Sequence, residues 1–149
     1  MALQFRRVVT GHDASGRAIV KIDEIAKNLV SSRPGATSCV VWTSQGFPVN
    51  NTGDEDAGLR KTGTTLDNGT VFRILELAPG ASPRNHRTDS IDYAVVMSGE
   101  IDMEIDGATV HLKAGDVLVQ RGTVPCVIAF VLIAAKPVEV GGKVLHAQG

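Results

Sequence analysis

Short β-prone runs separated by glycine and proline turns dominate the chain from residue 63 onward. They follow one another at close, regular spacing, and neither a long helical repeat nor an alternation of strands and helices competes with them. This pattern predicts an all-β fold, a small antiparallel β-barrel or jelly roll. The expected strands are residues 71–77, 93–98, 100–105, 109–113, 117–120 and 127–134.

The segment before this region is expected to frame the barrel. Residues 5–10 and 17–21 are β-prone and flank a polar turn, which predicts a hairpin. Residues 23–29 are interpreted as one or two helical turns with Asp23 as the N-cap. Residues 38–43 predict a further strand.

Two polar segments are interpreted as irregular. Residues 50–58 are acidic and rich in turn formers, which favours a solvated loop. Residues 136–149 are interpreted as a tail. We therefore expect one domain over residues 1–149, with its core barrel at residues 64–135.

Composition narrows the classes of partner. Hydrophobic residues make up 43% of the chain and charged residues 21%, so a packed core is expected. The net charge is −1 without a basic patch, which gives no support to nucleic-acid binding. Cys39 and Cys126 form no metal or redox spacing. The longest apolar run, residues 126–135, is too short for a membrane helix, and no signal peptide is visible. We expect a soluble cytoplasmic protein without a membrane partner.

One polar stretch breaks the apolar pattern. If residues 86–92 are extended, His86, Thr88, Ser90 and Asp92 point to the same face of the strand. Each buried polar group without a partner costs about 1–3 kcal/mol. A fold keeps such a face when a ligand binds there or when the groups satisfy one another. The stretch therefore predicts a polar site for a small molecule.

The order of residues around this stretch is distinctive. Gly80 is followed after five residues by His86, then come Thr88, Asp92 and Gly99, and Gly115-Asp116 opens a second motif. The set resembles the two motifs of the cupin superfamily, in its small single-domain members, and the resemblance extends over most of the chain. It implies an RmlC-like cupin fold, a small organic acid or polyketide-like ligand, and a homodimer.

The motif departs from the usual cupin pattern at the metal ligands. Thr88 stands where the family has a second His, Asp92 replaces Glu, and Val124-Pro125-Cys126 occupies the place of the third His. A catalytic metal usually has three protein ligands and an open position. The resemblance thus implies a degenerate metal site in which His86 remains as a ligand for Fe, Mn, Ni or Zn.

The same resemblance suggests roles for individual residues. His86 and Asp92 are the candidate acid/base pair, and hydrogen bonding between them and their neighbours is the alternative interpretation. Arg84, Thr88, Ser90, Gln120 and Arg121 are candidate substrate-binding residues.

A strand of the usual family pattern has no evident counterpart between residues 121 and 126. The barrel is open or capped by a partner, or residues 126–134 fill the empty position, or the sequence lacks residues that the natural protein has. An unbroken apolar run at residues 127–135 favours burial on both faces.

Three functions are consistent with these observations. The first is an acid/base lyase, isomerase or decarboxylase that uses His86 and Asp92. The second is a metal-dependent dioxygenase or decarboxylase with an unusual ligand set. The third is a cupin that binds a ligand without catalysis.

Overall fold

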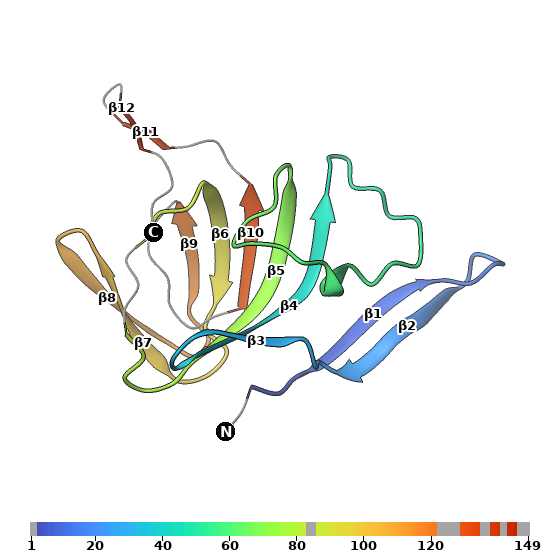
Figure 1. Ribbon diagram of the computed structural model, residues 1–149, viewed down its shortest axis with the longest axis horizontal. Coiled ribbons are helices and arrows are strands. Elements are labelled where there is room, and N and C mark those ends of the chain that lie inside the picture. The colour runs from blue at the N-terminus through green and yellow to red at the C-terminus, as the bar shows by residue number, and fades with distance from the viewer. Residues whose placement is uncertain (1–2, 83–85, 122–128, 135–137, 141–142, 146–149) are drawn as a thin grey trace.

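The computed structural model describes residues 3–82, 86–121, 129–134, 138–140 and 143–145 as an all-β structure of antiparallel strands (Figure 1). Its elements in chain order are β1 (Arg6–His12), β2 (Ala18–Ile25), β3 (Leu29–Arg33), β4 (Ala36–Gln45), the 3₁₀ helix η1 (Ala57–Leu59), β5 (Gly69–Leu77), β6 (Ser90–Val95), β7 (Glu100–Ile105), β8 (Ala108–Lys113), β9 (Val117–Arg121), β10 (Ala129–Ala134), β11 (Val138–Val140) and β12 (Lys143–Leu145). The all-β prediction is confirmed, and the arrangement is consistent with a jelly roll.

The largest sheet has the strand order β3-β4-β5-β10-β6-β9. Strand β10 lies between β5 and β6, so its backbone is hydrogen-bonded along both edges. The apolar run expected to be the last barrel strand is therefore an interior strand, although residues 127 and 128 lie outside the described part of the chain. Strand β9 pairs only with β6 among the described strands. The explanation for the missing strand stays a prediction, because residues 122–128 lie outside the described part of the chain.

A folded-back hairpin closes one end of this sheet. Strands β7 and β8 pair with each other, and Met103 and Leu112 pack against Ala94 and Val96 in a buried apolar cluster. Glu100, Asp102 and Glu104 are exposed and form the solvent side of β7. Strand β6 is therefore apolar at its C-terminal end, which leaves its N-terminal half for polar groups.

The N-terminal hairpin is present but longer than expected. Strands β1 and β2 form a ribbon that reaches away from the six-stranded sheet in Figure 1. Its tip is held by Asp13, which accepts hydrogen bonds from the backbone N–H groups of Ser15 (2.9 Å) and Arg17 (3.0 Å) and has a pKa lowered to about 2, mainly by the Ser15 hydroxyl. The hairpin prediction is confirmed.

The helical turn expected at residues 23–29 is wrong. Asp23 lies opposite Val8 within the hairpin and pairs with Arg6 at 2.6 Å instead of capping a helix. Because cross-strand pairing satisfies the backbone as far as Ile25, the strand continues where local propensity favoured a helix. Strand β3 then begins at Leu29.

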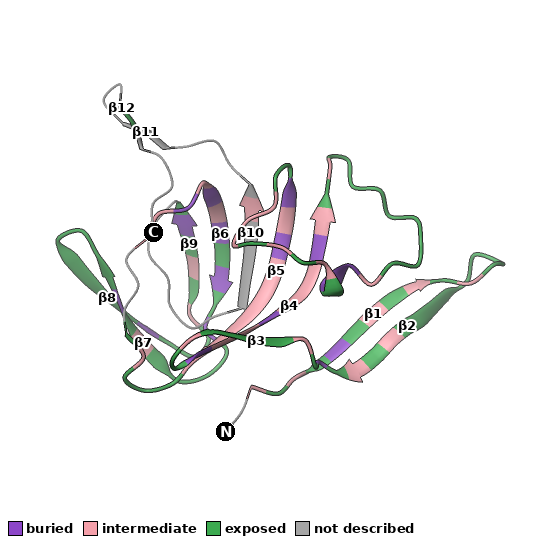
Figure 2. Cartoon of the chain, in the orientation of Figure 1, coloured by how far each residue is buried: buried purple, intermediate pink, exposed green. Residues whose placement is uncertain are grey.

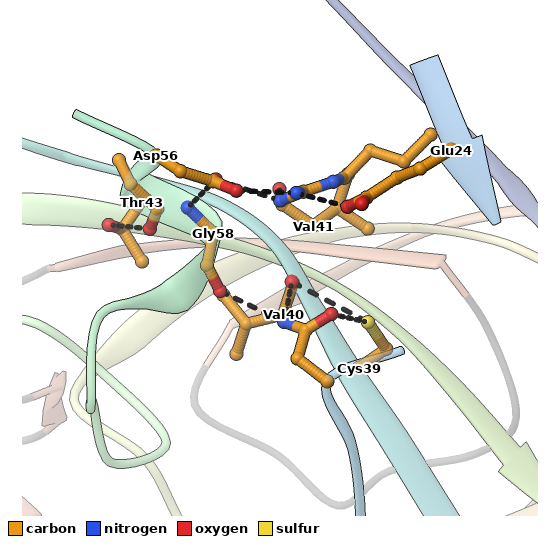
Figure 3. A network of polar contacts seen from close by, with 10 residues as sticks. Glu24, Cys39, Val40, Val41, Thr43, Asp56 and Gly58 are labelled. Carbon is orange, nitrogen blue, oxygen red and sulfur yellow. Dashed lines mark hydrogen bonds and ion pairs between the residues drawn. The ribbon is translucent and has the colours of Figure 1, made fainter. Parts of the chain in front are cut away.

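A buried arginine attaches this hairpin to the rest of the molecule. The side chain of Arg7 is only 2% exposed, and its Nη2 lies 2.6 Å from both Glu24 and Asp56. Asp56 also accepts a hydrogen bond from the Gly58 N–H at 3.0 Å, as the close-up in Figure 3 shows. The pKa of Arg7 is raised, first by its hydrogen bond to Asp56.

This contact corrects the interpretation of residues 50–58 as a solvated loop. Residues 50–55 are exposed, but Ala57 and Gly58 are buried in η1, which Asp56 caps. The end of the loop is thus a packed element. The tail prediction needs a similar correction, because β11 and β12 form a hairpin within it.

The outward face of β6 and β9 is apolar and exposed. Tyr93 and Val95 on β6 lie opposite Val119 and Val117 on β9, and all four are between 45% and 75% exposed. Tyr93 therefore lies on the outward face of the sheet. The homodimer remains a prediction, and the mass in solution by light scattering is its test.

Candidate functional site

Three polar side chains from one segment meet on the inward face of the six-stranded sheet. Thr88, Ser90 and Asp92 occupy alternate positions and are 9%, 3% and 5% exposed, and the buried bands along β6 are visible in Figure 2. The Ser90 Oγ lies 2.8 Å from the Thr88 Oγ1 and 2.6 Å from the Asp92 Oδ1. A hydroxyl has one proton, so with Asp92 ionised the chain of donors runs from Thr88 through Ser90 to Asp92.

Gln120 joins this group from the neighbouring strand. It lies opposite Asp92 in the β6–β9 register and is 2% exposed. Residues that face each other across antiparallel strands point to the same side of the sheet. The structure thus places four of the predicted site residues on one buried face.

Arg73 on β5 belongs to the same face. Its position lies opposite Phe130 on β10, which in turn lies opposite Ala94 on β6, two residues after Asp92. Side chains two residues apart on a strand share a face, so Arg73 and Asp92 project to the same side. The Nη2 of Arg73 donates to the carbonyl oxygens of Gly63 at 2.7 Å and Thr64 at 3.3 Å.

Burial controls the charge of the two ionisable groups. Desolvation raises the pKa of Asp92, and this effect is opposed by the Ser90 hydrogen bond and then by the charges of His86 and Arg73. Desolvation also lowers the pKa of Arg73, against the attraction of Asp92. A carboxyl whose pKa is raised in this way can hold a proton closer to neutral pH than an exposed aspartate.

The remaining predicted residues lie in different surroundings. His86 is half-buried and close enough for its charge to lower the pKa of Asp92. Arg121 is exposed and lies opposite Ile91, on the side of the sheet away from Asp92 and Gln120. Arg84 lies outside the described residues.

Known proteins resemble this chain over most of its length. It is 35% identical to the "Phomopsin biosynthesis cluster protein C'" of Diaporthe leptostromiformis, over 93% of this chain and 83% of that protein. It is 30% identical to the "Cupin-domain-containing oxidoreductase fogC" of Aspergillus ruber, over 92% of this chain and 76% of that protein. Residues 73–125 also match the family model described as a cupin domain.

The chain belongs to the cupin superfamily. A further relative is the "Oryzines biosynthesis cluster protein J" of Aspergillus oryzae, 30% identical over 95% of this chain and 89% of that protein. The family resemblance read from the sequence is thereby confirmed. In this cupin the first motif supplies the Thr88–Ser90–Asp92 chain, and the Gly115-Asp116 turn precedes the strand that carries Gln120.

Cupins often bind a divalent metal, but the side chains that the structure describes in this cupin fit such an ion poorly. No three His, Cys, Asp or Glu side chains come together in the described ranges in a way that could hold a metal. The donors at the site are His86, Asp92 and two hydroxyls that already bond to each other and to Asp92. This donor set falls short of the three protein ligands that a catalytic metal usually has.

Sequence reasoning missed Arg73. On the strand at residues 71–77, the alternate positions Val71, Arg73 and Leu75 form a row that is apolar except for the arginine. A cation in a row that faces a core is unusual, because desolvating it costs free energy. This break in the row was the available signal.

No helix in the described parts of the chain has the length and apolar character needed to cross a membrane.

Proposed function

We propose that this cupin binds a small organic acid or polyketide-like molecule on the inward face of its six-stranded sheet and moves a proton there with Asp92 and His86. The observation that carries the proposal is the buried Asp92, whose pKa is raised by burial and whose Oδ1 is fixed at 2.6 Å from Ser90. Relatives named for the biosynthesis of phomopsin and oryzines support a small-molecule substrate.

The proposed chemistry is proton transfer next to a carbonyl group. His86 accepts a proton from the carbon beside the carbonyl, and the electron pair of that C–H bond moves toward the carbonyl oxygen. Asp92 donates its proton to this oxygen, so an enol forms without a net change in charge. When His86 returns its proton to the same carbon, or to a carbon conjugated with the enol, Asp92 takes back the proton of the enol oxygen, and the product is the starting compound or an isomer. Positioned acid/base groups of this kind contribute about 10²- to 10⁴-fold to a rate.

Deuterium exchange tests this function without knowledge of the natural substrate. We would follow exchange of the carbon-bound protons of pyruvate, acetoacetate and 2,4-pentanedione in D₂O by NMR. We expect the protein to accelerate exchange of at least one probe, and Asp92→Asn and His86→Ala each to reduce that acceleration by at least 100-fold. Asp102→Asn is the matched control, since Asp102 is exposed on β7 and pairs with His111. An acceleration that persists in both site variants, or no acceleration by the wild type, would contradict the proposal.

The name oxidoreductase of one relative favours a second candidate, a metal-dependent oxidoreductase. In this alternative His86 and Asp92 would be ligands of the metal ion, and groups from outside the protein would fill its other coordination positions. Metal analysis of protein purified without chelator separates the two candidates. A content far below one ion per chain, unchanged after addition of iron, manganese, nickel or zinc, would remove the second candidate.

A further inference from the structure

Arg73 is held differently from four other arginines of the molecule. Each of those four pairs with at least one carboxylate: Arg6 with Asp23, Arg7 with Glu24 and Asp56, Arg17 with Asp13, and Arg60 with Glu55. The guanidinium of Arg73 contacts only backbone carbonyls, those of Gly63 and Thr64, among the described residues. Within the same residues, its positive charge has no counter-ion in contact.

Part of the guanidinium is also unmatched. The Nε of Arg73, like that of Arg7, is buried and has no hydrogen-bond acceptor in the described part of the chain, but Arg73 also lacks the carboxylate contacts of Arg7. A buried donor without an acceptor costs about as much as a lost hydrogen bond, and such a group calls for an explanation. The two carbonyls orient the side chain, but they leave both its charge and this donor unused.

The nearest acid at the site does not neutralise this charge by contact. Asp92 lies on the same face, yet it forms no ion pair with Arg73 in the described ranges, and its carboxylate bonds to Ser90 instead. Burial favours the neutral form of Asp92. Among the described residues, the Arg73 guanidinium therefore has no carboxylate in contact on this face of the sheet.

A purely structural role is the alternative explanation. The two carbonyl contacts attach the segment before β5 to the strand, and they would do so without any ligand. However, a neutral donor could make the same contacts without the cost of burying a charge. A ligand anion would account for the charge itself.

We propose that Arg73 recognises the ligand, and that this ligand carries a carboxylate group. The place of the ligand rests on the proposed function. The pairing follows from chemistry, because guanidinium groups form short, charge-assisted hydrogen bonds with carboxylates. Arg73 would hold the carboxylate, while Ser90 and Asp92 on β6 would face the rest of the ligand.

The test uses pairs of probes with the same shape and different charge. Acetate, benzoate and cinnamate are titrated against the full chain, alongside acetamide, benzamide and cinnamamide, and the Nε–H signal of Arg73 is followed by NMR. We expect at least one carboxylate to move this signal and to bind at least 10-fold more tightly than its amide. Arg73→Gln should weaken carboxylate binding by about 10- to 100-fold, the range for hydrogen bonds to charged groups, and leave amide binding unchanged.

Two controls keep the result interpretable. Arg60→Gln removes the same charge from an arginine paired with Glu55 and should not change binding. Arg73→Lys keeps the positive charge, so it should retain part of the preference for the carboxylate even if Arg73→Gln folds poorly. Equal binding of acids and amides, binding of none of the carboxylates, or an unmoved Arg73 signal would overturn the inference.

This inference and the proposed function fail in distinguishable ways. Loss of carboxylate preference without loss of Asp92-dependent exchange would remove only the role of Arg73. Intact carboxylate binding through Arg73, together with exchange that does not depend on Asp92, would remove only the proton-transfer function.

Discussion

Two clusters of the described residues bury charged groups, and the charged groups have different partners in each. At the base of the N-terminal hairpin, Arg7 is in contact with two carboxylates, Glu24 and Asp56, at 2.6 Å. On the inward face of the main sheet, Asp92 and Arg73 share a surface without direct contact, and each is instead hydrogen-bonded to neutral groups. We call the first cluster closed, because its charged groups contact one another. We call the second cluster open, because its charged groups do not.

This difference separates a structural role from a functional one. In the closed cluster the guanidinium charge is matched, and the pKa of Arg7 is raised by its partners. In the open cluster burial raises the pKa of Asp92 and lowers the pKa of Arg73, and both shifts favour the neutral form of the group. Groups whose pKa is perturbed by desolvation are more frequent at functional sites, although structural networks also perturb pKa values. The open cluster is therefore where a ligand could supply a partner for a buried charged group.

The largest difference between the clusters should appear when one acid is neutralised in each. Asp56→Asn leaves Arg7 buried with only Glu24 as a charged partner. We expect this variant to lose about 3 kcal/mol of unfolding free energy, at the lower end of the range for breaking a buried ion pair. Asp92→Asn removes a charge that burial disfavours and keeps an acceptor for Ser90, so its stability at pH 7 should be equal to or above that of the wild type. Urea denaturation of both variants measures the contrast.

Loss of stability in Asp92→Asn equal to that in Asp56→Asn would show that both clusters are structural. Glu24→Gln serves as a control within the closed cluster. Glu24 is more exposed than Asp56, with 39% against 22% of the side chain accessible, so its loss should cost less.

The next effect tests how tightly the closed cluster is packed. A Cβ added at Gly58 would lie 2.1 Å from the Arg7 Nη1 and 2.6 Å from the Val41 carbonyl oxygen. Since the carbonyl belongs to the backbone of β4, it cannot move aside freely. Gly58→Ala should therefore cost about 1–3 kcal/mol, the usual range for overpacking. Thermal unfolding measures it, and Gly53→Ala in the exposed part of the same loop is not a suitable control because Gly53 has a positive φ.

A better control for Gly58→Ala is Gly63→Ala. Gly63 lies in the same long connection, and its nearest contact to an added Cβ is the Thr65 carbonyl oxygen at 3.9 Å. A similar loss in both variants would mean that backbone freedom, rather than the Arg7 cluster, makes glycine necessary at position 58.

A smaller effect concerns the pH dependence of the open cluster. The native pKa of Asp92 lies above its ordinary value of 3.8, so the folded state binds this proton more tightly than the unfolded state. The contribution of Asp92 to stability is therefore most favourable below pH 3.8 and falls as pH rises toward the native pKa. A tenfold difference in proton affinity between the two states corresponds to about 1.4 kcal/mol.

The difference in unfolding free energy between wild type and Asp92→Asn, measured from about pH 3 to pH 8, isolates this group. It should fall with rising pH and then level off. A difference that rises with pH would show that the native carboxylate is stabilised, and the proposed proton donor would be lost.

Much of the fold could be predicted because local patterns and pairing agree. The Asn68 turn residue has the left-handed φ of 50° that its Asp-Asn-Gly context predicts, and the strands from Gly69 onward follow from period-two alternation. The prediction of a helical turn at residues 23–29 failed, because pairing with β1 outweighed a weak helical preference. The prediction of a solvated loop at residues 50–58 failed at Asp56, because its partner Arg7 lies 49 positions away in the sequence and no local pattern indicates their contact.

The candidate site shows the same division. The shared face of Thr88, Ser90 and Asp92 follows from their spacing, and the structure confirms that face. Arg73 lies on a strand separated from β6 by another strand, and β10 enters between them from much later in the chain. No local pattern places those two strands near each other. The catalytic and binding roles of the site residues remain predictions.

The smallest expected effect compares two adjacent arginines on one strand. Arg6 pairs with Asp23 through Nε at 2.6 Å and Nη2 at 2.7 Å, a geometry as good as that of Arg7 with Asp56. However, the side chains of Arg6 and Asp23 are 65% and 45% exposed, so water screens their attraction. Asp23→Asn should leave the urea midpoint unchanged within error, and any shift should vanish in 1 M salt, where the screening length is about 3 Å. Asp56→Asn should keep its deficit in the same salt. If the two variants responded alike, burial would not be what distinguishes the pairs, and the contrast between the closed and open clusters would lose its physical basis.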